Sequence, residues 1–319
     1  MPDDNIKENE EVAVEEEAVQ EQQQVEEKTY DAVIEDARKD LFKSYTLSRR
    51  ISTILMFVMV AAICGTMLLI IYVNKIAGYC TGGALLVGMI VYYALNRKRF
   101  PNKTKNYVAL VSKTINEELF KNKSFSEIKM NPEERLTMDD LVGDGIYAEA
   151  SGINSRNVVH GVFNGHHFLY AEAALIRPSS RKQVVPPLFV GRYVSVPNDM
   201  KFDNRFVVTI KNPKKPLDLP NAVSDLVLLE DKDDFSIYGP EGANYHDVLN
   251  SKTISQIHKA EIDDSLLNIN VVFWAGHTAA YLSYDDAIMA VPFEKPFDKN
   301  GFEKASKDLL AIFRAITEE

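Results

Sequence analysis

The sequence has little cysteine and no short motif that names a reaction. Only two of its 319 residues are cysteine, Cys64 and Cys80. Both lie in long apolar runs, where they behave as small apolar side chains and cannot build a zinc site or an extracellular disulfide framework. The chain contains no Gly-Lys-Ser/Thr phosphate loop, no His-Glu-x-x-His, no Cys-x-x-Cys and no Gly-x-Ser-x-Gly. These absences remove many enzyme classes, and no cofactor is expected.

Charge is absent from two neighbouring stretches, Ile51–Val73 and Ile76–Asn96, which only Asn74 and Lys75 separate. Each run exceeds the roughly 18 to 20 apolar residues that cross about 30 Å of hydrocarbon. Because a backbone in lipid must satisfy its own hydrogen bonds, we predict a transmembrane helical hairpin over residues 51–96. Buried core helices fit these lengths less well. A cleaved signal peptide fits poorly after fifty residues with an acidic start.

Basic residues gather at the outer ends of this hairpin and are scarce at its turn, which carries only Lys75. The flanking set is Arg38, Lys39, Lys43, Arg49 and Arg50 before the first run, then Arg97, Lys98, Arg99, Lys103 and Lys105 after the second. The positive-inside rule therefore places both termini in the cytoplasm. We expect a two-span protein of the cytoplasmic membrane, with the lipid bilayer as its first partner.

Small residues recur four apart within both apolar runs. The pairs are Ala61 with Gly65, Gly78 with Gly82, and Ala84 with Gly88. This spacing lets helix backbones approach closely in lipid. It serves either to close the hairpin on itself or to join protomers, and the sequence does not choose between them.

The acidity of the chain belongs to its first segment. Residues 1–28 hold eleven acids and two lysines, which accounts for −9 of the net charge of −10. The segment has no aromatic residue and too little apolar surface to form a core, so we predict a disordered acidic tail. It acts as a solvated spacer or recruits a basic partner. Because the remaining chain is nearly neutral, nucleic acid is not an expected partner.

Two amphipathic segments flank the apolar runs. Residues 29–50 carry apolar side chains at helical spacing, and residues 106–120 do the same within a basic linker that we assign to 97–135. Two alternatives remain open for these helices. They form a stalk side by side, or the first lies on the membrane surface.

From residue 136 to 319 the pattern becomes rich in short extended runs. Asn164-Gly165 between two such runs is typical of a type I′ hairpin, because both residues tolerate positive φ. Further strands are expected at 188–196, 205–211, 226–230, 235–238, 269–275 and 279–290, with a loop at Asn212–Pro216. Helices are expected at 243–260 and after Asn300-Gly301. Strands followed by end-capping helices indicate an α+β domain with a mostly antiparallel sheet and flanking helices.

Several short segments of this domain carry a resemblance. They are Gly143-Asp144-Gly145, Gly161–Gly165 through Ala171-Glu172, Phe189–Arg192, Leu229–Tyr238, Ala243–Tyr245, Ala280–Leu282 and Phe293-Glu294. With the two apolar runs before them, they resemble an uncharacterised family of bacterial membrane proteins, a domain of unknown function. Its members carry two membrane helices and then a cytoplasmic α+β domain. The chain departs from the family pattern at Asn244 and at Leu249–Ser251. The resemblance implies an architecture and no activity.

The best metal candidates lie on the Asn-Gly hairpin. If Phe163 pairs with His166, then His160 and His167 lie diagonally on one face, about 7 Å apart. Zinc would need further ligands, for which His246, His258 and His277 are the available histidines. The alternative is that these are ordinary sheet histidines, and no metal is expected.

Two acidic pairs and one glycine pattern complete the search for chemistry. Asp263-Asp264 and Asp285-Asp286 have the chemistry of cation ligands or an acid–base pair, yet each is more typical of a turn. Gly143–Ala148 matches the residue spacing of a dinucleotide fingerprint, but we predict that it opens a strand, whereas that fingerprint opens a helix.

The favoured interpretation is a non-enzymatic scaffold, assembly or regulatory protein that binds another protein, or a second copy of itself, at the cytoplasmic membrane face. The first alternative is an enzyme with unrecognised residues that acts on a membrane-proximal or lipidic substrate. The second is an oligomeric channel or transporter component. The two apolar runs contain no ionisable residue for an ion path, which disfavours the last alternative.

Overall fold

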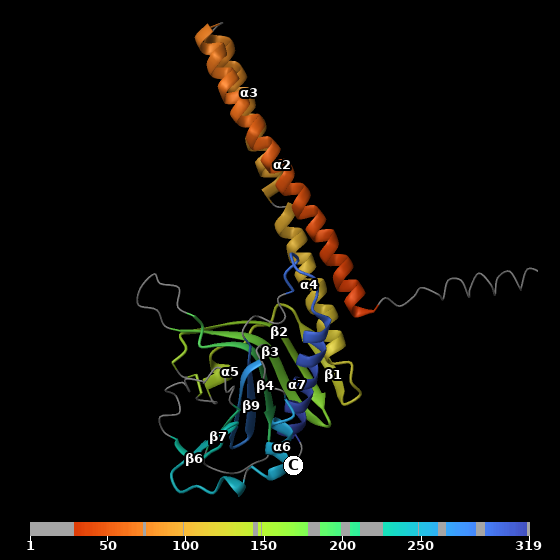
Figure 1. The fold of residues 1–319 in the computed structure, drawn as a ribbon, viewed down its shortest axis with the longest axis vertical. Coiled ribbons are helices and arrows are strands. Elements are labelled where there is room, and N and C mark those ends of the chain that lie inside the picture. The colour runs from red at the N-terminus through yellow and green to blue at the C-terminus, as the bar shows by residue number, and fades with distance from the viewer. Residues whose placement is uncertain are drawn as a thin grey trace, which may run out of the picture.

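A long helical arm projects from a sheet-containing domain (Figure 1). The computed structural model describes residues 29–72, 75–97, 99–142, 146–147, 149–177, 186–198, 205–210, 226–247, 249–260, 266–284 and 291–317. The acidic tail, Asn74, Lys98, the Gly143–Gly145 turn, the Asn212–Pro216 loop and both Asp-Asp pairs lie outside this part of the chain.

Three helices form this projection: α2 (Tyr30–Tyr72), α3 (Lys75–Arg97) and α4 (Arg99–Leu119). The upper part of α2 and α3 together are called the apolar arm. The predicted juxtamembrane helix and the first apolar run are a single helix, α2. Its 43 residues extend about 65 Å. Pro101 lies in the first turn of α4 and does not disrupt the helix, because a proline there removes only an N–H that has no partner inside the helix.

Among the described residues, nine strands form one antiparallel sheet in the order β1-β2-β3-β4-β9-β8-β5-β7-β6. Their bounds are β1 Phe125–Asn131, β2 Gly152–Phe163, β3 His166–Ile176, β4 Phe189–Pro197, β5 Phe206–Ile210, β6 Val227–Asp231, β7 Phe235–Gly239, β8 Leu266–Trp274 and β9 His277–Tyr284. Both outermost strands carry a β-bulge. The register of β1 shifts between Ser126 and Lys129, and that of β6 shifts between Leu228 and Glu230.

Short helices and one long helix flank the sheet. They are α5 (Asp139–Val142), the 3₁₀ helix η2 (Tyr245–Asp247), α6 (Ser251–Ile257) and α7 (Lys299–Thr317). Asn250 caps α6 by accepting a hydrogen bond from the Thr253 amide. Asp298 caps α7 in the same way, through the Gly301 amide at 3.0 Å.

The two faces of the sheet bury separate cores. One core contains α7, the lower part of α2, and α4, together with aromatic side chains from the strands. Phe313 of α7 lies at its centre and contacts the rings of Phe125, Phe163 and Phe168. The opposite core is smaller and includes Leu141 of α5.

The predicted α+β class, with a mostly antiparallel sheet and flanking helices, is confirmed. The Asn-Gly hairpin has the predicted register, with Phe163 opposite His166 and His160 opposite Leu169. Asn164 and Gly165 have φ of 48° and 92°, as its turn requires. Two differences concern extent. The segment assigned to the linker contains β1, and the helix expected over 243–260 is η2 and α6, separated by a break.

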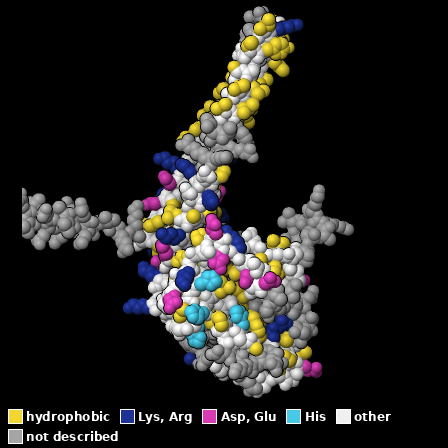
Figure 2. Space-filling view, turned by 180° about the vertical axis from the view of Figure 1, so that it is seen from behind, with side chains coloured by type: hydrophobic (Ala, Val, Ile, Leu, Met, Phe, Trp, Pro, Cys, Tyr) yellow, Lys and Arg dark blue, Asp and Glu magenta, His cyan; other side chains and the backbone are white. Residues whose placement is uncertain are grey.

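The apolar part of the arm is exposed within this structure. Of the described helices, α2 contains an apolar stretch long enough to cross a membrane, and α3 contains a shorter one at Gly78–Tyr92. Large apolar side chains such as Ile54, Phe57 and Leu86 point outwards there. Figure 2 shows hydrophobic side chains along the far part of the arm, with Lys and Arg at its tip and below it.

Candidate functional site

The lower part of α2 packs against α4, so the two helices form a stalk between the apolar arm and the sheet (Figure 1). Ile34 and Leu41 of α2 are buried with Val111 and Ile115 of α4. The Lys103 ammonium donates a hydrogen bond to the Ser44 hydroxyl at 2.8 Å. Of the two arrangements that the sequence left open for these helices, the structure has the stalk.

Segment 291–297 fastens the stalk to the domain. Arg38 of α2 donates a hydrogen bond from Nη1 to the Phe293 carbonyl at 3.1 Å. It also makes two contacts to Glu35, at 2.6 and 2.7 Å, and this hydrogen bonding holds the pKa of the Glu35 carboxyl below its usual value. Tyr107 of α4 donates to the Val291 carbonyl at 3.2 Å, and burial raises its pKa to about 12. The stalk helices are therefore held to the domain on their inner side by specific polar contacts.

The N-terminal end of α2 is attached to α7. Tyr30 packs against Phe297 and Phe302, and its hydroxyl donates a hydrogen bond to Glu303 at 3.3 Å. Asp31 lies 3.2 Å from the Lys299 ammonium. Because α7 also packs on the sheet, the stalk and the sheet are connected through one helix.

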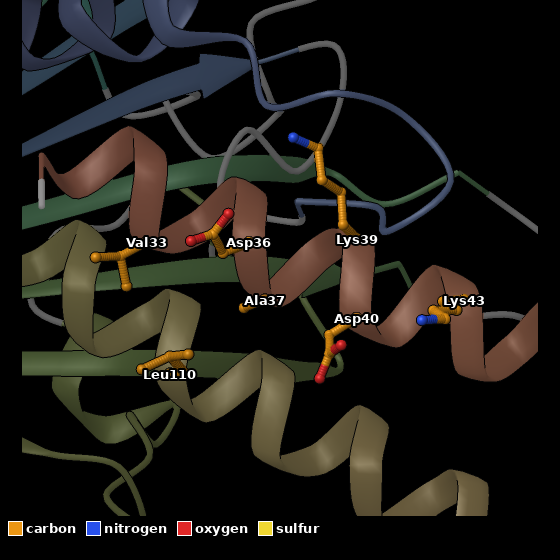
Figure 3. A pocket seen from close by; sticks show the side chains of 7 residues that line it. All are labelled: Val33, Asp36, Ala37, Lys39, Asp40, Lys43 and Leu110. Carbon is orange, nitrogen blue, oxygen red and sulfur yellow. The ribbon is translucent and has the colours of Figure 1, made fainter.

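A groove of about 570 Å³ lies on the stalk between α2 and α4 (Figure 3). Val33, Ala37 and Leu110 form its apolar part. Charged side chains of α2 border it: Asp36, Lys39, Asp40 and Lys43. The apolar side chains of Phe42, Val108 and Leu110 are exposed on the same stalk. An apolar floor with charges of both signs around it suits contact with another protein chain.

A buried charged cluster connects the sheet to α7. Arg192 of β4 is 1% exposed and donates a hydrogen bond to the Ala305 carbonyl of α7 at 2.6 Å. Its cross-strand neighbour Glu172 accepts from Arg156 at 2.6 Å and from Asn157 at 3.0 Å. Buried charges are tolerated where they are paired and hydrogen-bonded in this way. The cluster lies in the interior, and its contacts explain how α7 is held.

The structure keeps the two hairpin histidines close but does not give them shared metal ligands. His160 lies 2.7 Å from Glu134, and His167 is its diagonal neighbour. His258 lies near Asp234 beside β7, toward the opposite end of the sheet. Among the described residues, no group of three or more His, Cys, Asp or Glu side chains is placed to hold a metal ion.

Ser195, which no sequence pattern indicated, lies beside His277 on one face of the sheet. The Ser195 hydroxyl of β4 and His277 Nε2 of β9 are 2.5 Å apart, and burial lowers the pKa of His277. His277 stacks near Trp274, whose ring centroid lies 4.6 Å away. This is the geometry of a hydroxyl beside a neutral base. Ser195, however, is 3% exposed in the middle of a sheet.

The small residues of the arm divide into two groups. A Cβ at Gly78 would overlap the Ile70 side chain, and one at Gly82 would lie 3.1 Å from Thr66, so these glycines face α2 closely. At Gly65 and Gly88 a Cβ would meet nothing within 4 Å. The Gly78 and Gly82 pair therefore closes the contact between α2 and α3.

The charged flanks of the arm are placed in part. Arg49 and Arg50 lie in α2, below the apolar stretch, and both are exposed. Arg97 ends α3 and Arg99 begins α4, and Lys98 between them lies outside the described residues. Both basic groups thus fall at the same end of the antiparallel helix pair.

No protein-family model and no curated protein matches the chain. Among solved structures, it is similar to the crystal structure of the mycobacterial trehalose monomycolate transport factor A, TtfA. The TM-score is 0.32 and the identity 11%, over 63% of this chain and 96% of the other. A likeness at this level carries no argument about function, and membership of the uncharacterised two-span family stays a prediction.

Proposed function

We propose that this chain is a membrane-anchored platform that binds another protein at the cytoplasmic face. The observation that carries the proposal is α2, which runs without a break from an exposed apolar stretch to a lower half packed on the domain. A helix of this kind places the sheet at a fixed distance from the bilayer. We also propose that the chain belongs to the uncharacterised two-span family that its sequence resembles.

In this proposal α2 and α3 form a membrane hairpin with two spans. The close approach at Gly78 supports a paired arrangement in lipid. The basic residues at Arg49, Arg50 and Arg97–Arg99, against a single Lys75 at the turn, support cytoplasmic termini.

Topology is tested with a membrane-impermeant maleimide on intact cells. In a Cys64→Ala, Cys80→Ala background, Lys75→Cys labels from outside, whereas Lys121→Cys in the domain labels only after the cells are permeabilised. Labelling of Lys121→Cys in intact cells would contradict the proposed orientation. If Lys75→Cys is not labelled in intact cells, the turn is not exposed on the outside.

The stalk groove is the contact surface that we propose for the partner. Leu110 lies in the groove and is exposed, so Leu110→Glu introduces a charge without opening a core. Ala109→Glu, at an exposed neutral position on the same helix, is the matched control outside the groove. Proteins co-purified in mild detergent are compared for the three chains. A defined partner that is lost only with Leu110→Glu supports the proposal, and a partner retained by all three excludes the groove.

The Ser195–His277 contact favours one second candidate, an enzyme with a serine nucleophile acting on a membrane-proximal substrate. A fluorophosphonate probe tests it directly, because the probe reacts with an activated serine hydroxyl. Labelling that disappears in Ser195→Ala would support the enzyme. Under the platform proposal the probe does not label the chain.

A further inference from the structure

The two helices of the apolar arm meet at one end and leave a groove along the rest. Near the turn, Gly78 approaches Ile70 and Gly82 approaches Thr66, which fixes α2 and α3 as antiparallel neighbours. The groove has a volume of about 1180 Å³ and is lined from both helices. Near the turn it begins at Ile70, and it continues to Ser52 at the other end.

The lining of this groove is apolar and adaptable. Met56, Met59, Met67 and Met89 contribute to it, and methionine is a flexible side chain that fills irregular space. Ala84 and Gly88 line the α3 side of the groove, and because neither carries a large side chain they leave space within it. A flexible hydrocarbon chain fits such a lining without a specific shape match.

Beside its apolar side chains, the lining carries hydroxyl groups at Thr66 and Thr81 toward the turn and at Ser52 and Thr53 toward the other end. Ser52 and Thr53 line that end, and Arg49 and Arg50 follow on the next turn of α2, both exposed. Arg97 ends α3 and Arg99 begins α4 at the same end. The groove is thus mostly apolar along its length and has two adjacent arginines beside the end farthest from the turn. This polarity matches an amphiphile with a hydrocarbon tail and an anionic head.

We infer that the groove between α2 and α3 holds an acyl chain of an anionic phospholipid, whose phosphate lies beside Arg49 and Arg50. The inference rests on the proposed insertion of the arm into the bilayer. A membrane helix from a partner would also cover an apolar groove. The adjacent Arg49 and Arg50, against a single Lys75 at the turn, favour an anionic headgroup at this end, because basic residues near the cytoplasmic surface attract such headgroups.

Two glycines of α3 provide a matched pair of variants. Gly88 lines the groove and Gly83 does not, yet a Cβ at either position would meet nothing within 4 Å. Gly88→Leu therefore fills the groove, and Gly83→Leu adds the same side chain outside it.

The test is native mass spectrometry of the full chain in mild detergent with equal amounts of phosphatidylglycerol and phosphatidylcholine. The unmodified chain and Gly83→Leu retain one phosphatidylglycerol. Gly88→Leu loses about tenfold or more of this binding, because its side chain occupies the site. Arg49→Gln and Arg50→Gln each reduce the preference for phosphatidylglycerol by about fivefold, the factor for one basic residue near an anionic headgroup.

Equal retention of phosphatidylglycerol by Gly88→Leu and Gly83→Leu would overturn the inference. Equal binding of the two lipids by the unmodified chain would overturn it as well. So would a dimer without bound lipid, because a second copy would then cover the groove. Alkaline extraction of membranes separates this failure from that of the proposed function. If the chain resists extraction and yet shows no groove-dependent lipid, only the lipid site is wrong. If alkali releases the chain from membranes, the proposed anchor is wrong as well.

Discussion

The lower and upper halves of α2 are parts of one helix that meet opposite surroundings. In residues 30–50, apolar side chains such as Ile34 are fully buried against α4 and the domain, and charged side chains such as Asp36 and Lys39 are exposed. In residues 51–72, side chains as large as Ile54, which is 61% exposed, face away from the protein. A continuous helix can therefore be a structural element of the domain at one end and need a separate apolar environment at the other.

The largest expected difference between the halves concerns stability. Ile34→Ala removes a fully buried side chain and should lower the free energy of unfolding of the domain by about 2–5 kcal/mol. Ile54→Ala, the same change in the upper half, should leave it unaltered. Denaturant unfolding of the full chain in mild detergent, followed by the fluorescence of Trp274, measures both. Equal losses would mean that the upper half also packs against the domain.

The second-largest expected difference between the halves concerns insertion of α2 into the membrane. Phe57→Lys places a charge in the apolar stretch and should disfavour insertion by roughly 3 kcal/mol. Phe42→Lys, on the stalk, should leave insertion unchanged. Membrane fractionation after an alkaline wash reports the outcome. The comparison fails if the Phe42→Lys chain also leaves the membrane, or if the Phe57→Lys chain remains fully inserted.

The polar attachment of the lower half should contribute less than its core. Arg38→Gln removes hydrogen bonds to Phe293 and Glu35, which should cost about 1–3 kcal/mol. Lys39→Gln, at the exposed neighbouring position, should change stability by less than about 0.5 kcal/mol. Hydrogen exchange in segment 291–297 should rise with Arg38→Gln alone. If exchange there stays slow, other contacts hold the stalk.

The smallest expected effect is a pH dependence of the same attachment. Because Arg38 holds the pKa of Glu35 below 4.5 in the folded chain, the unfolded chain binds more protons as the pH falls below that value. The stabilising contribution is complete above pH 4.5 and is lost as the pH falls through the folded pKa. Unfolding from about pH 6 to about pH 3 should therefore show a steeper loss for the unmodified chain than for Glu35→Gln. Parallel pH profiles would show that this carboxylate contributes nothing.

The parts of the fold that were predictable from sequence are those that depend on local patterns. Asn164-Gly165 determines both a turn and the register of β2 against β3, so the positions of His160 and His167 followed from the sequence. Helix α7 was predictable from its apolar spacing. The continuity of α2 was not, because a change of composition at Ile51 marks a change of surroundings and not a helix end.

The features that were missed depend on contacts between distant segments. Ser195 and His277 are 82 positions apart and meet only because β4 pairs with β9. Five residues separate strand β1 from α4, and the strand alternates polar and apolar residues only briefly, so it was assigned to a linker. The buried position of Arg192 was equally invisible, since its partner on α7 is a backbone carbonyl that any sequence supplies.

The bulges in the two outermost strands have a consequence for a chain held at a surface. Anchored proteins share a plane, so their effective concentration is far above that of the same number of molecules in free solution. An open sheet has two edges at which it can add a strand from a neighbour, and such addition can continue without limit. Here the irregular register of β1, with Glu127 at φ 53°, and that of β6 interrupt the regular ladder at both edges. In the proposed membrane-anchored arrangement, crowded copies can thus sit side by side without joining their sheets.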